Sequence, residues 1–87
     1  MNNITFAPAA WDEYLYWQTQ DKKTLRRINQ LLRDIQRDSF NGVGKPEPLK
    51  QRVDCWSRRI DDKNRLVYCI HGDKDIIIIS CRGHYED

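Results

Sequence analysis

The sequence lacks any long run of apolar residues. Its longest unbroken aliphatic stretch is Ile76–Ile79, whereas a helix needs roughly 20 apolar residues to cross a bilayer. The first ten residues have neither the basic region nor the apolar region of a secretory signal. These absences argue against a membrane protein and a secreted one, and we expect a cytoplasmic protein.

Cysteine and histidine are also scarce. Cys55, Cys69 and Cys81 are separated by 14 and 12 residues, which matches no CxxC metal or redox pattern. The sequence therefore predicts ordinary reduced thiols in strands. His71 and His84 form no metal-ligand spacing, so we expect no metal site and no cofactor.

Repeats, low-complexity tracts and linkers are absent too. A chain of 87 residues without them is expected to form one domain over residues 1–87. Charged residues make up 32% and hydrophobic residues 39%, a balance typical of a well-solvated globular protein and not of a disordered acidic tail.

Positive charge is missing from the first part of the chain. Residues 1–21 contain no Lys or Arg, whereas residues 22–65 contain thirteen basic residues against six acidic ones. Residues 66–87 are again slightly acidic. A basic middle favours a phosphate-bearing partner or an acidic protein partner, although a solvated basic helix face would give the same count.

Helical spacing dominates the first half of the chain. Pro8 suits the first turn of a helix over residues 8–19. A second helix is predicted from Asp21, a suitable N-cap, to about Arg37. Its apolar stripe consists of Leu25, Ile28, Leu31, Leu32 and Ile35. Few residues separate the two segments, so they should form an antiparallel hairpin.

The second half is predicted to form strands. Residues 38–48 contain two Gly and two Pro and indicate an ordered loop. Cys55–Ile60, Arg65–His71 and Asp75–Arg82 then suit a three-stranded antiparallel meander, after a short extended segment at Ile4–Phe6. The predicted fold is α+β, with the N-terminal helical hairpin on a small twisted antiparallel sheet. One face of the sheet stays free, and function should lie there.

Glu47 and His84 are the candidate acid–base groups. Glu47 lies between Pro46 and Pro48, which restrict its backbone, so its carboxylate is a candidate general base. His84 follows the last predicted strand and is a candidate general acid. A rigid loop with an incidental acid, and an exposed chain end, are the plainer interpretations. His71 precedes Gly72 in a predicted turn, and a structural role suits it better.

Three arginines surround the first predicted hairpin. Arg58 and Arg59 are adjacent, so a regular strand directs them to opposite faces, and only one of them can meet a ligand beside Arg65. Guanidinium groups suit phosphate oxygens. Trp56 and Tyr68 offer surfaces for base stacking, although packing in the sheet explains them as well.

Together these groups suit one reaction, the cleavage of RNA through its own 2′-hydroxyl. A base removes the 2′-OH proton, cations stabilise the phosphorane-like transition state, and an acid protonates the departing 5′-oxygen. DNA lacks this internal nucleophile.

Five motifs resemble one known family. They are WDEYLYW at Trp11–Trp17, GKPEPLK at Gly44–Lys50, WSRRI at Trp56–Ile60, RLVY at Arg65–Tyr68 and the terminal pair His84-Tyr85. They resemble the YoeB (Txe) branch of the RelE/ParE toxin superfamily over nearly the whole chain. The resemblance implies a helical hairpin packed on a small antiparallel sheet. It also implies the toxin of a type II toxin–antitoxin module, a bacterial endoribonuclease that cleaves mRNA in the ribosomal A site.

The resemblance also implies residue roles. Glu47 becomes the general base, His84 the general acid and Arg65 the group that stabilises the transition-state phosphate. Supporting or substrate-orienting roles fall to Lys50, Arg59 and Tyr85. The implied partners are a YefM-like antitoxin with an acidic C-terminal segment, the 70S ribosome with mRNA, and a second copy of the chain.

Three departures from the family pattern stand out. Asn64 occupies a position where relatives usually have His, and Asp54-Cys55 replaces a small or Gly-containing pair. Glu86-Asp87 extends beyond the His-Tyr end of many relatives. None of them removes a proposed catalytic group. The competing hypotheses are a ParE-like inhibitor of DNA gyrase with the same fold and a non-catalytic ribosome- or RNA-binding module.

Overall fold

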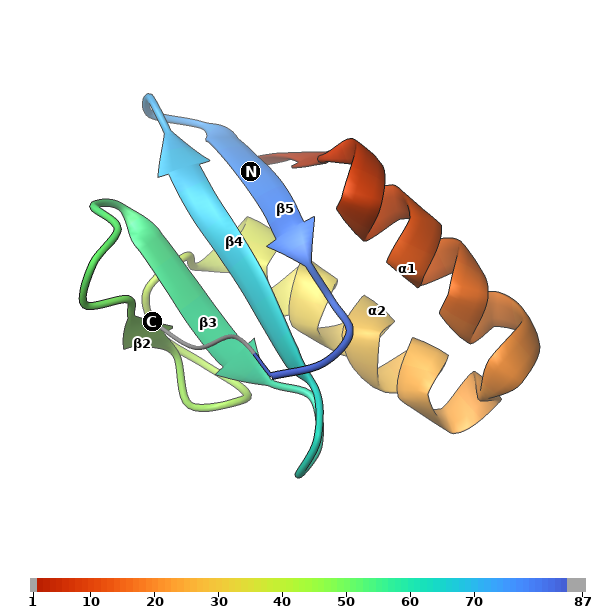
Figure 1. The fold of residues 1–87 in the computed structure, drawn as a ribbon. Coiled ribbons are helices and arrows are strands. Elements are labelled where there is room, and N and C mark those ends of the chain that lie inside the picture. The colour runs from red at the N-terminus through yellow and green to blue at the C-terminus, as the bar shows by residue number, and fades with distance from the viewer. Residues whose placement is uncertain (1, 85–87) are drawn as a thin grey trace.

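The structure, a computed structural model, describes residues 2–84. Two helices pack on one face of a five-stranded sheet, so the fold is α+β, as predicted from the order of the segments (Figure 1). In chain order, the elements are β1 (Asn3–Phe6), α1 (Pro8–Gln20), α2 (Lys22–Arg37), β2 (Glu47–Pro48), β3 (Cys55–Arg59), β4 (Arg65–His71) and β5 (Asp75–Ser80). The strands lie in the order β1-β5-β4-β3-β2.

Asp21 joins the two helices. Its backbone N–H donates to the Trp17 carbonyl and ends α1, while its carboxylate accepts from the N–H groups of Lys23 and Thr24 and begins α2. Because one residue serves both helix ends, the chain reverses sharply there. The helical hairpin predicted from the apolar spacing is confirmed.

The core lies between the helices and the sheet. Ile28, Leu31 and Ile35 of the predicted stripe are fully buried. They belong to the same cluster as Ala10 and Trp17 of α1 and the sheet residues Leu66, Tyr68, Ile76 and Ile78. Burial of this stripe supplies the main driving force that holds α2 on the sheet.

The sheet contains two strands more than the meander. The predicted meander is present as β3, β4 and β5, which pair antiparallel. On one side β1 runs parallel to β5, with Ile4 opposite Ile76. A pairing between residues so far apart leaves no local sequence signal. On the other side β2 pairs with β3, so Glu47-Pro48, expected as the end of a loop, instead forms a short strand.

The cysteines differ from the prediction. Cys55 and Cys69 form a disulfide between β3 and β4, so the prediction of reduced thiols is wrong for this pair. The two residues face each other directly in the strand register, a relation that their separation in the sequence does not reveal. Cys81 is free and buried, and burial, together with Glu13, raises the pKa of its thiol to about 12.

Arg58 ties the sheet to the helices and the following loop. Its side chain is fully buried, and Nη1 donates to the Asp34 carboxylate at 2.6 Å. Its remaining donors bind the Tyr68 hydroxyl and the carbonyls of Asp38, Asn41 and Val43. Arg58 therefore has a structural role on the helix side, and Arg59 is the residue that faces away from the helices.

Gly42 lies against this buried ion pair. Its φ is +131°, and a Cβ there would overlap the Asp34 carboxylate and lie 3.2 Å from Nη1 of Arg58. We expect Gly42→Ala to lower the free energy of unfolding by about 2–4 kcal/mol. Gly72→Ala is the matched control, because Gly72 also has positive φ (+67°) but has open space around it, and about 1 kcal/mol is expected. Equal losses in urea unfolding would contradict this interpretation.

Asp34 should make the fold sensitive to acid. Hydrogen bonds from Arg37, from the Val43 N–H and from Arg58 outweigh burial and lower its pKa from 3.8 to about 2. Because the folded chain holds this proton more weakly than the unfolded chain, the stabilisation is complete above roughly pH 4 and is lost as the pH falls toward 2. Urea unfolding between pH 2 and 6 should show this loss, and Asp34→Asn should flatten it. Parallel pH profiles for the wild type and Asp34→Asn would contradict this role of Asp34.

Candidate active site

Strand pairing brings Glu47 and Arg65 together. Glu47 of β2 lies opposite Ser57 of β3, and Arg65 begins β4 opposite Arg59. Nη2 of Arg65 and Oε2 of Glu47 are 4.0 Å apart. The Arg65 side chain is 20% exposed, whereas that of Glu47 is 67% exposed. The guanidinium therefore forms the floor of the site, and the carboxylate projects beside it into solvent.

Ser57 holds the Arg65 guanidinium in place. Its Oγ accepts hydrogen bonds from Nε of Arg65 at 3.2 Å and from Nη2 at 3.1 Å. Ser57 itself is buried. Ser57 was not predicted as a site residue, although strand alternation places it on the same face as Arg59. The signal in the sequence is a hydroxyl residue two positions before Arg59 on the same predicted strand.

The segment after β5 brings the backbone before His84 next to the start of β4. Gly83 donates its N–H to Oδ1 of Asn64 at 2.8 Å and accepts from the backbone N–H of Arg65 at 3.1 Å. His84 follows directly and is exposed. Arg65 thus contacts Glu47 through its side chain and the peptide preceding His84 through its backbone. The site lies on the face of the sheet away from the helices.

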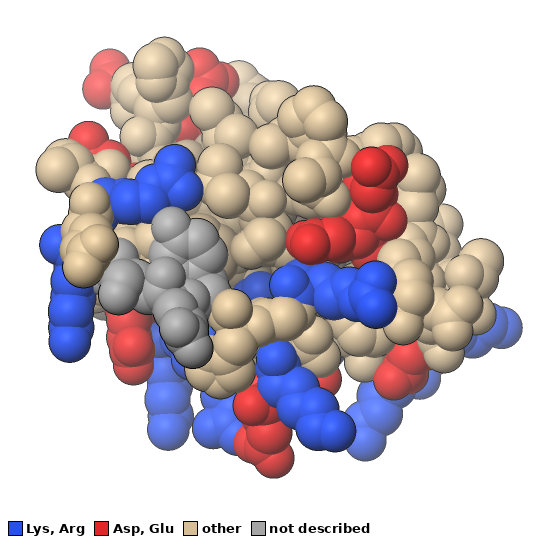
Figure 2. Space-filling model, in the orientation of Figure 1, with Lys and Arg blue, Asp and Glu red and all other residues tan. Residues whose placement is uncertain are grey.

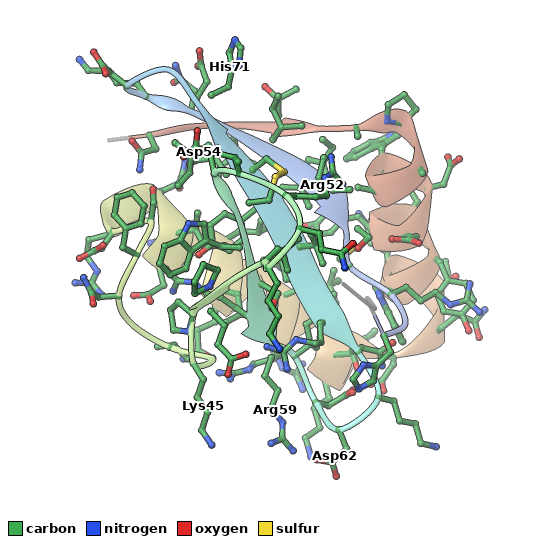
Figure 3. All side chains as sticks on the ribbon, turned by 60° about the vertical axis from the view of Figure 1, so that its left-hand side comes forward. Lys45, Arg52, Asp54, Arg59, Asp62 and His71 are labelled. Carbon is green, nitrogen blue, oxygen red and sulfur yellow. A yellow bond between two sulfur atoms is a disulfide. The ribbon has the colours of Figure 1, made fainter. Side chains whose placement is uncertain are left out.

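The proposed supporting cations Arg59 and Lys50 lie on β3 and between β2 and β3. Arg59 lies opposite Arg65 in the β3–β4 register, but its guanidinium pairs with Asp62. Figure 3 shows Arg59 and Asp62 at the lower end of the sheet. Lys50 is exposed and lies three residues after Glu47, between β2 and β3. Tyr85 lies outside the described residues.

His71 lies far from this site. It ends β4 beside the turn into β5, and Figure 3 shows it at the opposite end of the molecule from Arg59. His84, by contrast, directly follows Gly83, whose carbonyl accepts the backbone N–H of Arg65. Within residues 2–84, His, Cys, Asp and Glu form no group of three or more that could hold a metal ion.

Basic side chains gather toward the end of the molecule that carries the site. Figure 2, drawn in the orientation of Figure 1, shows Lys and Arg along the lower part of the molecule, with some acidic residues among them. This asymmetry follows from the basic middle of the chain. Such a surface attracts polyanions. Over residues 2–84, none of the helices is long and apolar enough to cross a membrane.

Comparison with known proteins identifies the family. The family model described as "YoeB-like toxin of bacterial type II toxin-antitoxin system" matches residues 6–85. The chain belongs to this family. A YoeB toxin from Synechocystis sp. is 54% identical over 95% of this chain and 96% of its own length.

Two solved structures of YoeB-like toxins have the same fold. The YoeB dimer from Staphylococcus aureus superposes with a TM-score of 0.88 at 46% identity, covering 97% of this chain and 98% of that one. A heterotetrameric YoeB–YefM toxin–antitoxin complex from the same species gives 0.85 at 46% identity, covering 98% of this chain and 99% of that one. The chain is thus a YoeB-like toxin of a type II toxin–antitoxin system.

Proposed function

We propose that this YoeB-like toxin is an endoribonuclease that cleaves mRNA in the ribosomal A site without a metal ion. The observation that carries the proposal is the position of Arg65. Its side chain lies 4.0 Å from the Glu47 carboxylate, and its backbone binds the Gly83 peptide just before His84. These two contacts support a site in which Glu47 is the base, Arg65 the cation and His84 the acid.

The three groups divide the reaction between them. Glu47 takes the proton from the 2′-hydroxyl, whose oxygen then attacks the adjacent phosphorus. Arg65 stabilises the negative charge that builds up on the phosphoryl oxygens. His84 gives a proton to the departing 5′-oxygen. The P–O5′ bond breaks, and the products are a 2′,3′-cyclic phosphate and a 5′-hydroxyl end.

The surroundings of Arg65 suit this role. Ser57 binds one edge of the guanidinium through Nε and Nη2, so the cation is already oriented before the transition state forms. Glu47 and His84 are exposed, which allows a strand presented by a large partner to reach them. Lys50, Arg59 and Tyr85 are proposed to support the phosphate and orient the substrate, and Arg59 must exchange Asp62 for a phosphate to do so.

The proposed partners follow from the family. We propose a YefM-like antitoxin for this chain, because the S. aureus relative is known in complex with YefM. An acidic antitoxin segment would complement the basic surface. A homodimer is proposed by the same reasoning from the S. aureus dimer. With ribosome-bound mRNA as the proposed substrate, a cytoplasmic location is proposed as well.

Mapping of RNA ends tests the function directly. Purified toxin is added to ribosomes programmed with a defined mRNA, and primer extension locates new 5′ ends. We expect cuts within the A-site codon and a 2′,3′-cyclic phosphate on the upstream fragment. A substrate with 2′-deoxyribose at the cleaved position should stay intact. Binding to ribosomes without new ends would contradict the proposal and support a non-catalytic module, and DNA breaks with intact mRNA would support a gyrase inhibitor.

A further inference from the structure

In the segment after β5, Cys81 and Gly83 are each held by two hydrogen bonds. Cys81 is bound by α1, and Gly83 is bound by residues 64 and 65. Cys81 donates its N–H to the Glu13 carboxylate and accepts at its carbonyl from Nε1 of Trp17, both residues of α1. Two residues later, Gly83 donates to Asn64 and accepts from the N–H of Arg65. Four hydrogen bonds thus fix the path of the chain to His84.

The Asn64 side chain is oriented by Asp61. Nδ2 of Asn64 donates to both carboxylate oxygens of Asp61, at 3.1 and 3.2 Å. Asp61 is in turn fixed by the backbone N–H groups of Lys63 and Asn64, each at 2.8 Å. Because the amide nitrogen faces a carboxylate, the amide oxygen must face Gly83. The acceptor for the Gly83 N–H is therefore preorganised.

The bend at Gly83 sets the direction in which the chain leaves this contact. Its φ is +85°, in the region that favours glycine, and open space surrounds the position of a Cβ. Two hydrogen bonds, to Asn64 and Arg65, hold the Gly83 peptide itself, while the neighbouring Arg82 stacks on the Tyr16 ring of α1. Release of the Asn64 contact should therefore allow this peptide to rotate and carry His84 with it.

We propose that Asn64 is a positioning residue for catalysis, which holds His84 beside Arg65 through the Gly83 peptide. This inference rests on the proposed ribonuclease function. Asn64 acts through its hydrogen bond to the Gly83 N–H, which fixes the backbone just before His84. Asp61 serves the same purpose one step further away. The Asx-like turn at residues 61–64 is thus part of the active-site scaffold.

Single-turnover cleavage of ribosome-bound mRNA gives the first test. We expect Asn64→Ala to lower the maximal rate by about 10–100-fold, because small displacements of a catalytic group have effects of this order. The toxin concentration at half-maximal rate should not change. Asn29→Ala is the matched control, since Asn29 also uses Oδ1 in an exposed hydrogen bond, at 2.6 Å from the Tyr14 hydroxyl. An unchanged rate for Asn64→Ala would overturn the proposal.

A double-mutant cycle separates positioning from general structural damage. In a His84→Ala background, Asn64→Ala should cause no further loss, because the residue that it positions is already gone. An equal further loss would overturn the proposal.

The exchanged pair Asp61→Asn with Asn64→Asp keeps a donor, an acceptor and the contact with Gly83, so it should recover most of the rate that Asn64→Ala loses.

Amide exchange at Gly83 tests the contact without relying on cleavage. Selective ¹⁵N-glycine labelling gives only four backbone signals, because the chain contains four glycines. Asn64→Ala should speed exchange at Gly83 about tenfold or more and leave Gly42 and Gly44 unchanged. Unaltered exchange at Gly83 would overturn the proposal even if cleavage fell. A wild-type protein that cuts no mRNA would contradict the proposed function instead, and the exchange data would then decide alone whether Asn64 holds this segment.

Discussion

Glu47→Gln and His84→Ala should each slow mRNA cleavage on the ribosome by about 10²–10⁴-fold. Gln has nearly the shape of Glu but cannot accept the 2′-hydroxyl proton, and Ala cannot protonate the 5′-oxygen. Single-turnover assays with saturating toxin measure this loss at the chemical step. Both side chains are exposed, so the free energy of unfolding should hardly change.

His71→Ala is the matched control for His84→Ala. His71 is also exposed, but it lies at the far end of β4, away from Arg65. The His71→Ala variant should cleave mRNA at the wild-type rate. If Glu47→Gln and His84→Ala also cleaved at that rate, the assignment of base and acid would be wrong, even though the protein cleaves mRNA.

Arg58→Met should lower the free energy of unfolding by about 3–5 kcal/mol. The substitution keeps much of the buried volume but removes one of the partners of Asp34 and the donors that satisfy three loop carbonyls. Asp34 then keeps its contacts with Arg37 and the Val43 N–H but loses its buried partner, and the loop carbonyls lose their donors in a largely dry place. Urea unfolding followed by the fluorescence of the tryptophans provides the measurement.

Arg59→Met is the matched control for stability. It removes the neighbouring arginine of the same strand, whose ion pair with Asp62 lies on the surface. About 0–1 kcal/mol is expected, as for exposed ion pairs in general. Similar losses for both variants would show that the buried contacts of Arg58 contribute no more than a surface charge.

The fold was largely predictable because its signals are local. The apolar stripe of α2 and the cap at Asp21 specify a helix within a few residues, and three β-prone segments separated by turns specify the meander. By contrast, the β1–β5 pair and the Cys55–Cys69 disulfide depend on which residues face each other across strands. Strand register is set by the whole sheet and is hidden in a single sequence.

The sequence allowed the reactive groups of the candidate site to be proposed, but not the residues that support them. Glu47, Arg65 and His84 were recognised by their chemistry and by motif resemblance. Ser57 and Asn64 carry no reactive group, and their contacts with Arg65 and Gly83 appear only once the strands are paired. The two adjacent arginines show the same limit, because alternation indicates opposite faces for Arg58 and Arg59 but not which residue faces which side.

The parallel strand β1 also has a protective role. It covers one edge of β5, the strand with the run Ile76–Ile79, so the main-chain groups there pair within the molecule. An uncovered, apolar edge of this kind is a template for the addition of strands from other molecules, which leads to aggregation. The four residues Asn3–Phe6, although only partly buried, therefore block the addition of a foreign strand to β5.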